Sequence, residues 1–257
     1  MIVNRTLVIS DIHGCYREFV ELLERMEYNP INDRLILLGD YVSRGPCSRE
    51  VVQLVMILVE EHGAIALQGN HDHRFVRVME NEATEKETAR FFDFGGLETL
   101  RSYCNNDITI NQEHLDEIRS YMGQFESHIA FLKGLPYYYE DRDYIYVHAG
   151  VNPNGGPLSE QDLQDLLYIK EAFYNHKTNL EKVVIFGHTI TPDIHGVPDI
   201  WEGEDKIGID GGCAFGYQLN GLVLKDGRLN ETYYIKADSC SFKANRSTYS
   251  RTMKAST

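Results

Sequence analysis

The sequence predicts an α/β fold, and two features of its 257 residues point to it. The first is a set of short runs of branched and aromatic residues with little polar alternation, which is typical of buried strands. The second is the helical spacing of apolar residues between the first three runs. Five runs have this form: Thr6–Ile9, Leu35–Leu38, Ala64–Leu67, Tyr144–Val147 and Val183–Phe186.

Two helices are predicted between the first three runs. Residues 16–26 place most of their apolar side chains along one face. Ser48 can cap a second helix over residues 49–61, and Gly63 follows as a stop signal. The resulting β-α-β-α-β order indicates parallel strands with covered faces. In such sheets, ligands bind at the carboxyl ends of the strands.

The remainder of the chain predicts an insert and further strands. Residues 73 to about 135 are charged and helix-prone, which indicates a helical insert or cap. Hairpin-like runs in the C-terminal third, between Lys206 and Ile235, suggest a second, largely antiparallel sheet. We therefore expect one domain over residues 1–237 and a polar, loosely held tail over residues 238–257.

Composition excludes several classes of protein. A net charge of −14 argues against broad nucleic-acid binding, which needs a basic surface, although bound metal ions would still allow a phosphate substrate. No apolar run is long enough to cross a bilayer, and the N-terminus lacks the layout of a signal peptide. The five cysteines are odd in number and form no CxxC pair. We expect a cytoplasmic protein with reduced thiols and no membrane partner, and its oligomeric state is left open.

Each of the five apolar runs ends in residues that can bind a metal ion. The candidates are Asp11, His13, Asp40, Asn70, His71, His148 and His188. Carboxylate, amide and imidazole groups are ligands for hard or borderline divalent ions. Asp11 and His13 can reach one ion, Asp40 can bridge two ions, and Asn70, His148 and His188 complete the second.

A single Asp or His at a strand end is more often a turn residue or a hydrogen-bonded polar group than a metal ligand. Here, however, five independent strand ends all supply compatible ligands. An explanation by turns and hydrogen bonds alone is therefore weak. Among the other histidines, only His73 follows the cluster directly, and it is a candidate for substrate contact.

Five sequence blocks resemble the calcineurin-like metallophosphoesterases. They are Ser10–Gly14, Gly39–Gly45, Gly69–Asp72, His148–Gly150 and Gly187–Thr189. The pattern is most similar to the serine/threonine phosphoprotein phosphatase branch, which includes bacterial and phage protein phosphatases and symmetrical diadenosine tetraphosphate hydrolases. Because five blocks follow in the family's order, the signal is far more specific than a lone Gly-Asn-His.

The resemblance implies a four-layer αββα sandwich of two mixed sheets with a dinuclear metal site at the sheet edge. It implies that a metal-bridging hydroxide attacks phosphorus, that His71 is the general acid and that Arg44 clamps the phosphate. Manganese is the expected metal, although iron, zinc, cobalt or nickel also suit this ligand set.

The sequence departs from the family pattern at two functional positions. Lys170 follows Tyr168-Ile169 where the bacterial pattern has arginine after Trp-Ile, so a substrate-binding role for this lysine would rest on a point charge. Ser43 stands where the family usually has an aspartate that orients the catalytic histidine. A serine brings no charge, so His71 should hold its proton less well near neutral pH.

We expect a metal-dependent phosphatase that acts on phosphoserine or phosphothreonine in proteins. The alternative is a symmetrical diadenosine tetraphosphate hydrolase, for which the Phe91–Gly96 stretch is a candidate base-binding floor, although core packing is the stronger interpretation of that stretch. A third possibility is a phosphate-binding regulatory module whose catalysis has decayed, and only Ser43 favours it.

Overall fold

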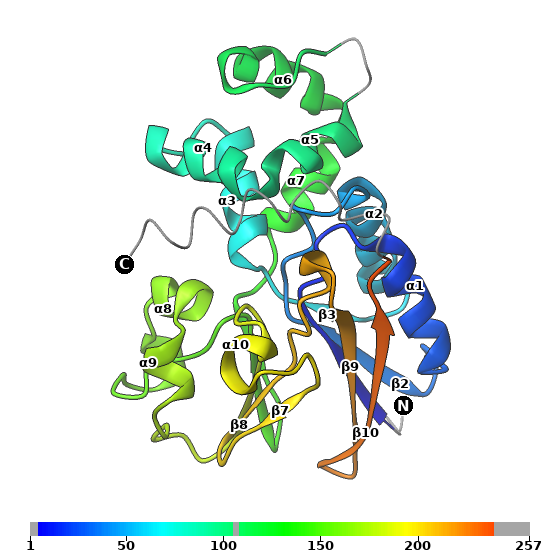
Figure 1. The fold of residues 1–257 in the computed structure, drawn as a ribbon, viewed down its shortest axis with the longest axis vertical. Coiled ribbons are helices and arrows are strands. Elements are labelled where there is room, and N and C mark those ends of the chain that lie inside the picture. The colour runs from blue at the N-terminus through cyan, green and yellow to red at the C-terminus, as the bar shows by residue number, and fades with distance from the viewer. Residues whose placement is uncertain (1–4, 105–107, 239–257) are drawn as a thin grey trace.

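The computed structural model describes residues 5–104 and 108–238, which form two five-stranded sheets between helices (Figure 1). The first sheet has the order β10-β9-β1-β2-β3. Its strands are β1 (Arg5–Ile9), β2 (Asp33–Leu37), β3 (Ile65–Ala66), β9 (Gln218–Lys225) and β10 (Arg228–Lys236). The first three are parallel, and β9 pairs with β1 in the antiparallel sense. The predicted β-α-β-α-β unit is therefore confirmed.

The second sheet has the order β4-β5-β6-β8-β7. Its strands are β4 (Tyr138–Glu140), β5 (Tyr144–Val147), β6 (Val183–Phe186), β7 (Trp201–Glu202) and β8 (Lys206–Gly208). The three inner strands β5, β6 and β8 run parallel, and the two edge strands are antiparallel to their neighbours. Both sheets are mixed, as the family resemblance implies.

The C-terminal strands do not form the separate antiparallel sheet that their hairpin pattern suggested. The hairpin of β9 and β10 extends the first sheet beside β1, whereas β8 joins the second sheet parallel to β6. A hairpin does form between β9 and β10, but a hairpin's own pattern does not specify the strand against which it packs. Apart from Asp238, the predicted tail lies outside the described residues.

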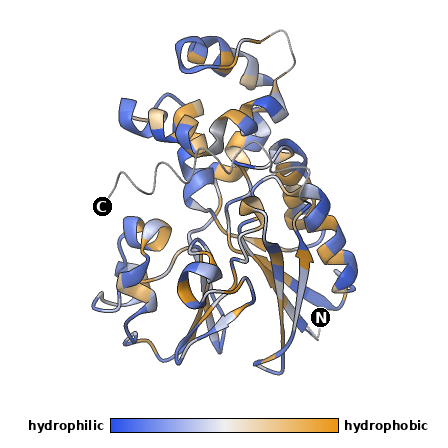
Figure 2. Cartoon of the chain, in the orientation of Figure 1, coloured by the Kyte–Doolittle hydropathy of each residue, from blue (hydrophilic) through white to orange (hydrophobic). Residues whose placement is uncertain are grey.

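The core is arranged in layers because alternate residues of each strand face opposite sides. In β1, Leu7 and Ile9 pack with the helices that cover the first sheet, whereas Val8 faces the second sheet. In β5, Tyr144 and Tyr146 face the first sheet, and their neighbours pack with the helices of the other side. Figure 2 shows apolar residues along these strands. The order of layers is helix, sheet, sheet, helix.

Helices cover the outer faces of both sheets (Figure 1). On the first sheet they are α1 (Tyr16–Arg25) and α2 (Ser48–Glu60). On the second they are α8 (Leu163–Tyr168), α9 (Glu171–Tyr174) and α10 (Thr191–His195). Short 3-10 turns lie at η2 (Gln112–His114), η3 (Gly123–Phe125), η4 (Leu158–Glu160) and η5 (Cys213–Phe215). Within the described ranges, no helix combines the length and apolar character that a membrane span requires.

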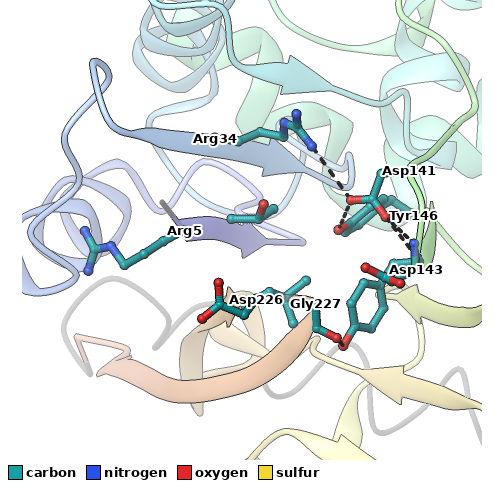
Figure 3. Close-up of a pocket in the computed structure, with 10 residues that line it drawn as sticks. Arg5, Arg34, Asp141, Asp143, Tyr146, Asp226 and Gly227 are labelled. Carbon is teal, nitrogen blue, oxygen red and sulfur yellow. Dashed lines mark hydrogen bonds and ion pairs between the residues drawn. The ribbon is translucent and has the colours of Figure 1, made fainter. Parts of the chain in front are cut away.

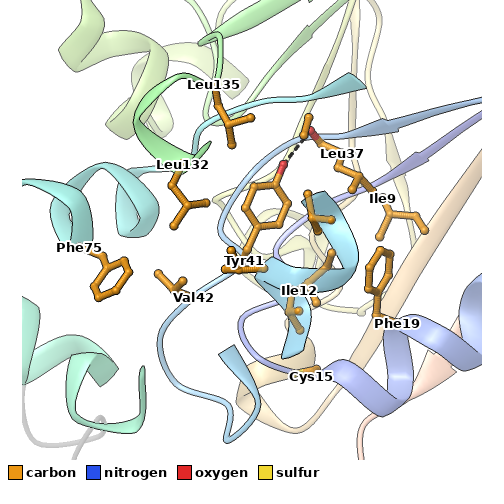
Figure 4. Packing of buried hydrophobic residues seen from close by; sticks show 14 of the residues in the cluster. Ile9, Ile12, Cys15, Phe19, Leu37, Tyr41, Val42, Phe75, Leu132 and Leu135 are labelled. Atoms are coloured by element: carbon orange, nitrogen blue, oxygen red, sulfur yellow. Dashed lines mark hydrogen bonds between the residues drawn. The ribbon is translucent and has the colours of Figure 1, made fainter. Parts of the chain in front are cut away.

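The predicted insert is helical and lies beyond the carboxyl ends of the strands (Figure 1). It comprises α3 (Asn70–Met79), α4 (Glu85–Phe91), the π-type turn η1 (Phe92–Gly96), α5 (Leu97–Tyr103), α6 (Leu115–Met122) and α7 (Glu126–Lys133). Thr84 and Glu87 form a capping box that begins α4. In Figure 4, Leu132 and Leu135 lie beside Tyr41 of the β2 exit, so the insert shares the core of the first sheet.

The insert also supports the loop that follows β2. The backbone N–H of Arg44 donates to the Gly95 carbonyl oxygen at 3.1 Å, and the N–H of Ser43 donates to Thr99 Oγ1 at 2.8 Å. Gly95 has a φ of +95°, and a Cβ atom on it would lie 2.4 Å from the Arg44 nitrogen. Only glycine fits here, because it tolerates positive φ and adds no side chain at the contact.

Replacing Gly95 with alanine should therefore destabilise the protein and displace the Arg44 loop. Positive φ alone costs an alanine roughly 1–2 kcal/mol, to which the backbone clash adds. Urea denaturation measures the change in the free energy of unfolding. Gly123→Ala is the matched control in the same insert, since its φ is −54° and its Cβ atom would meet nothing within 4 Å. Equal stability of the two variants would contradict the role given to Gly95.

Candidate metal and phosphate site

The five strand exits bring the predicted metal ligands together at one edge of the two sheets. Asp11 and His13 follow β1, Asp40 follows β2, Asn70 and His71 begin α3 after β3, His148 follows β5 and His188 follows β6. All are buried except His188, which is half-buried. Parallel strands that end at the same edge explain why residues up to 177 positions apart in sequence meet here.

Asp40 joins two groups of potential ligands. In the first, His13 Nε2 lies 3.3 Å from Asp40 Oδ2, and His71 is the third member. In the second, His148 Nε2 lies 3.6 Å from Asp40 Oδ1, and His188 completes the group. Within each group the ligand atoms lie within 4.8 Å of one another. A carboxylate with one oxygen in each group has the geometry that a bridging ligand requires.

Backbone carbonyl groups fix the orientation of two imidazole rings. His13 Nδ1 lies 2.7 Å from the Val42 carbonyl oxygen, and His148 Nδ1 lies 3.0 Å from that of Leu38. In each neutral ring, Nδ1 therefore donates and the lone pair of Nε2 points to the centre of the cluster. His148 Nε2 then faces Asn70 Oδ1 at 2.9 Å. Both atoms are hydrogen-bond acceptors, and a cation satisfies such a pair.

Asp11 is held by groups on both sheets. Ser10 donates a short hydrogen bond to Asp11 Oδ2, and the backbone N–H of His188 donates to the same oxygen at 2.9 Å. Asp11 Oδ1 lies 3.9 Å from His13 Nε2. The Ser10 hydroxyl therefore has an orienting role that the sequence did not suggest.

The backbone is strained at the candidate ligands. Asp11, His13, Asp40 and His188 all have positive φ, at 54°, 45°, 58° and 64°. This left-handed region is uncommon for residues other than glycine, although Asp, Asn and His enter it more often than most. Strain of this kind persists only where the surrounding structure enforces it, and it is concentrated at functional sites.

Asp72 supplies much of that enforcement. Its carboxylate accepts backbone N–H groups of Gly69 at 3.0 Å, Asp40 at 2.7 Å, Tyr41 at 2.9 Å and Val42 at 3.3 Å. Asp72 is fully buried. Burial and the charge of Asp40 raise the pKa of Asp72, and the backbone donors act in the opposite sense. This one side chain ties the β2 exit to the start of α3.

Three histidines of the cluster have pKa values below the usual value. Burial, then the charge of Arg44, lower the pKa of His13 and that of His71 well below the usual value. Burial and the neighbouring His148 do the same to the pKa of His188. Only the neutral imidazole has a lone pair for a metal ion, so these shifts favour ligation.

Arg44 enters the cluster from the loop after β2. Its guanidinium contacts His13 Nε2 and lies 2.9 Å from His71 Nε2, to which it donates. The guanidinium carbon lies 4.8 Å from the centre of the Phe215 ring. A guanidinium seated on an aromatic ring keeps its planar fork of donors in a fixed orientation, which suits the oxygens of a phosphate group.

Ser43 does not assist His71 in this structure. Its hydroxyl is buried and has no hydrogen-bond partner in the part of the chain that is described. His71 is instead contacted by Arg44 and packs edge-on against the His13 ring at 4.9 Å. A cation beside the ring opposes protonation, which agrees with the expectation that His71 holds its proton poorly.

The two remaining predicted residues lie at the periphery. Lys170 is exposed at the start of α9, and its charge contributes to lowering the pKa of His188. His73 is half-buried, and its ring packs against Tyr137 at 6.4 Å. No contact among the described residues joins His73 to the cluster, so its substrate contact stays a prediction.

The donor set fits divalent metal ions. It combines imidazole nitrogens, carboxylate oxygens and one amide oxygen, a mixture that suits borderline ions. His188 Nε2 is buried without a hydrogen-bond partner among the described residues. A buried polar atom without a partner is costly, and coordination would remove that cost.

A cavity lies at the opposite ends of the strands. It has a volume of about 210 Å³, and its rim includes Arg5, Arg34, Asp141 and Asp143 (Figure 3). Its charged groups are largely paired within the protein. Arg34 lies 3.8 Å from Asp141, which also accepts a hydrogen bond from the Tyr146 hydroxyl at 3.0 Å. It lacks the convergent histidines of the strand-exit cluster, so we do not assign it a role.

Two curated proteins show similarity of different extent. A protein of Aromatoleum aromaticum named symmetrical bis(5'-nucleosyl)-tetraphosphatase is 32% identical over 145 residues, covering 56% of this chain and 44% of its own length. The chain thus spans less than half the length of that relative. A Bacillus subtilis protein named asymmetrical bis(5'-nucleosyl)-tetraphosphatase PrpE is 26% identical over 84% of this chain and 88% of its own.

Solved structures support the fold. The cold-active protein-tyrosine phosphatase of a psychrophilic Shewanella species aligns with a TM-score of 0.56 and 16% identity, over 91% of this chain and 81% of that one. Residues 4–192, which contain all five strand exits, match the sequence pattern of calcineurin-like phosphoesterases. The chain belongs to the calcineurin-like phosphoesterase family.

Proposed function

We propose that this protein is a dinuclear-metal hydrolase that cleaves dinucleoside polyphosphates such as diadenosine tetraphosphate. The two curated relatives, both named bis(5'-nucleosyl)-tetraphosphatases, support this substrate over the phosphoprotein first expected from the sequence. The observation that carries the proposal is the state of His71. It has a lowered pKa and a cationic neighbour, and Ser43 supplies no charge near it.

The basicity of the leaving group connects that observation to the substrate. A general acid must carry a proton when the bond breaks, and a histidine whose pKa lies well below 6.5 is mostly deprotonated at neutral pH. A serine alkoxide is a strong base and needs that proton. The nucleotide phosphate released from a polyphosphate chain is a much weaker base and needs far less help. His71 is therefore better suited to phosphoanhydride cleavage.

The other residues have separate tasks in the proposed reaction. Asp11, His13, Asp40, Asn70, His148 and His188 would hold two divalent ions, with Asp40 shared between them. Bound ions of this kind neutralise phosphate charge and lower the pKa of a coordinated water. Arg44 would direct its two terminal nitrogens at oxygens of the reacting phosphoryl group. Manganese is the proposed metal.

Hydrolysis of phosphoserine or phosphothreonine remains the competing function. The Phe91–Gly96 stretch favours it to a degree, because Phe91 is buried and stacked on Phe75 at 6.0 Å and is not available as a floor for a base. Phe92 and Phe94 stay partly exposed, so a base could still stack at this edge of the insert.

A substrate panel on manganese-loaded protein tests the proposal. Diadenosine tetraphosphate should be cleaved with a kcat/KM at least about tenfold above that of a phosphoserine peptide, a difference of about 1.4 kcal/mol in transition-state binding. EDTA should abolish hydrolysis, and added Mn²⁺ should restore it. A preference for the phosphopeptide would reverse the assignment, and inactivity of the metal-loaded protein on every phosphate ester would point to a decayed binding module.

Asp40→Asn should empty the metal site at least in part, because the variant loses the charge and one strong donor of a carboxylate that has one oxygen in each group of histidines. Elemental analysis of the purified variant should find fewer than two ions per chain. Asp116→Asn is a suitable control, since that side chain is 96% exposed in the insert. Two ions still bound to the Asp40 variant would rule out the bridge.

Ser43→Asp should raise turnover on an alkyl phosphate such as phosphoserine more than on p-nitrophenyl phosphate. The new charge raises the pKa of His71, so a larger fraction of the ring carries its proton near neutral pH. Activity should also extend to higher pH, because the protonated acid is lost only as pH rises through its pKa. Equal gains on the two substrates would show that proton donation is not the limiting factor.

A further inference from the structure

Arg74 is a buried arginine beside the cluster, and no carboxylate in the described ranges forms an ion pair with it. It lies on α3, four residues after Asn70 and three after His71, so the three side chains share one face of the helix. Arg74 is only 8% exposed. Among the described residues it forms no ion pair, and its contacts are with aromatic rings. A buried cation without a counter-charge is costly, and a bound anion would offset that cost.

Two rings hold the Arg74 guanidinium in place. Its carbon lies 5.9 Å from the centre of the Phe94 ring of the insert and 5.9 Å from that of Tyr168 in α8. The Tyr168 hydroxyl is close enough that hydrogen bonding with Arg74 affects its pKa. The three groups form a preorganised unit in which a guanidinium and a phenol can both donate hydrogen bonds.

This unit adjoins the candidate metal ligands. The Tyr168 ring packs edge-on against His188 at 6.3 Å. The charge of Arg74 contributes to the lowered pKa of His71, and the charge of Asp40 acts on the Tyr168 hydroxyl. Arg44 packs on Phe215, whereas Arg74 packs on Phe94 and Tyr168, so different aromatic rings hold the two arginines beside the cluster. A group bound at Arg74 would therefore lie next to the reacting phosphoryl group.

We infer that Arg74 and Tyr168 form an anion subsite for a second phosphoryl group of the substrate, adjacent to the one that is cleaved. This inference rests on the proposed dinucleoside polyphosphate function and extends it to a recognition site. A guanidinium fork matches two oxygens of a phosphate group. Because the subsite is recessed, it suits a group joined to the reacting phosphorus through one bridging oxygen better than an acidic side chain on a bulky peptide.

Arg74→Gln and Arg74→Lys test the subsite in manganese-loaded protein. We expect Arg74→Gln to lower the ratio of kcat/KM for diadenosine tetraphosphate to kcat/KM for p-nitrophenyl phosphate by about 30-fold, mainly through KM. Arg74→Lys keeps the charge but loses the fork, and should fall between this variant and the wild type. Tyr168→Phe should shift the ratio in the same direction. Arg90→Gln removes an equal charge from an exposed position of the insert and should leave the ratio unaltered.

Calorimetric titration supplies a measurement that does not depend on turnover. Inorganic tripolyphosphate should bind Arg74→Gln about 30-fold more weakly than wild type, with a much smaller change for orthophosphate. If Arg74→Gln does not fold, as judged by circular dichroism, the lysine and Tyr168→Phe variants carry both measurements, since each keeps most of the packing.

Three results would overturn the subsite. Equal losses on both substrates would assign Arg74 to the reacting phosphoryl group or to packing. Unchanged tripolyphosphate affinity would show that Arg74 does not bind a phosphate anion. A loss of activity confined to phosphopeptides with acidic neighbours would show that the subsite binds a peptide and not a polyphosphate. Failure of the proposed function looks different, because wild type would then cleave p-nitrophenyl phosphate and not the dinucleotide. The tripolyphosphate titration would still decide the subsite in that case.

Discussion

The carboxylate of Asp72 accepts hydrogen bonds from four backbone N–H groups, and the geometry of the cluster depends on them. Three of these donors belong to the β2 exit and one precedes α3. These hydrogen bonds stabilise the backbone around Asp40 in its strained conformation with positive φ. The backbone N–H of His71 then donates to Asp40 Oδ1 at 2.8 Å. Asp72, which is not one of the candidate metal ligands, thus fixes the positions of the proposed bridging ligand and of the proposed general acid.

The two sheets have different tasks at this edge. The first supplies Asp11, His13 and Asp40 on closely spaced parallel strands, whereas the second supplies His148 and His188 across the interface. Hydrogen bonds connect them: His148 to the Leu38 carbonyl oxygen, and the His188 N–H to Asp11. Any sliding of one sheet over the other would separate the two groups of ligands. The apolar layer between the sheets therefore contributes to the site as well as to stability.

Much of this arrangement could be predicted from the sequence. Buried strands end in polar residues, and parallel strands end at one edge, so the strand exits were readable from local pattern. The contacts of Asp72 could not be read, because they join a side chain to the backbone of residues about 30 positions earlier. The sheet that β9 and β10 join could not be predicted either, because tertiary packing and not the local sequence pattern determines it. Arg74 was accessible in principle, because its helical spacing from Asn70 and His71 places it on the same face.

The insert and the strand exits contribute different kinds of residue to the candidate site. Every candidate metal ligand lies at a strand exit or at the start of α3. The groups that orient the two arginines come largely from elsewhere: Gly95 and Thr99 support the Arg44 loop, and Phe94 lies under Arg74. In the proposed reaction, changes in the insert would therefore alter the binding of phosphate groups while the strand exits keep the candidate metal ligands. In the proposed site, the metal ions and the phosphate groups of the substrate would thus be bound by residues from different parts of the chain.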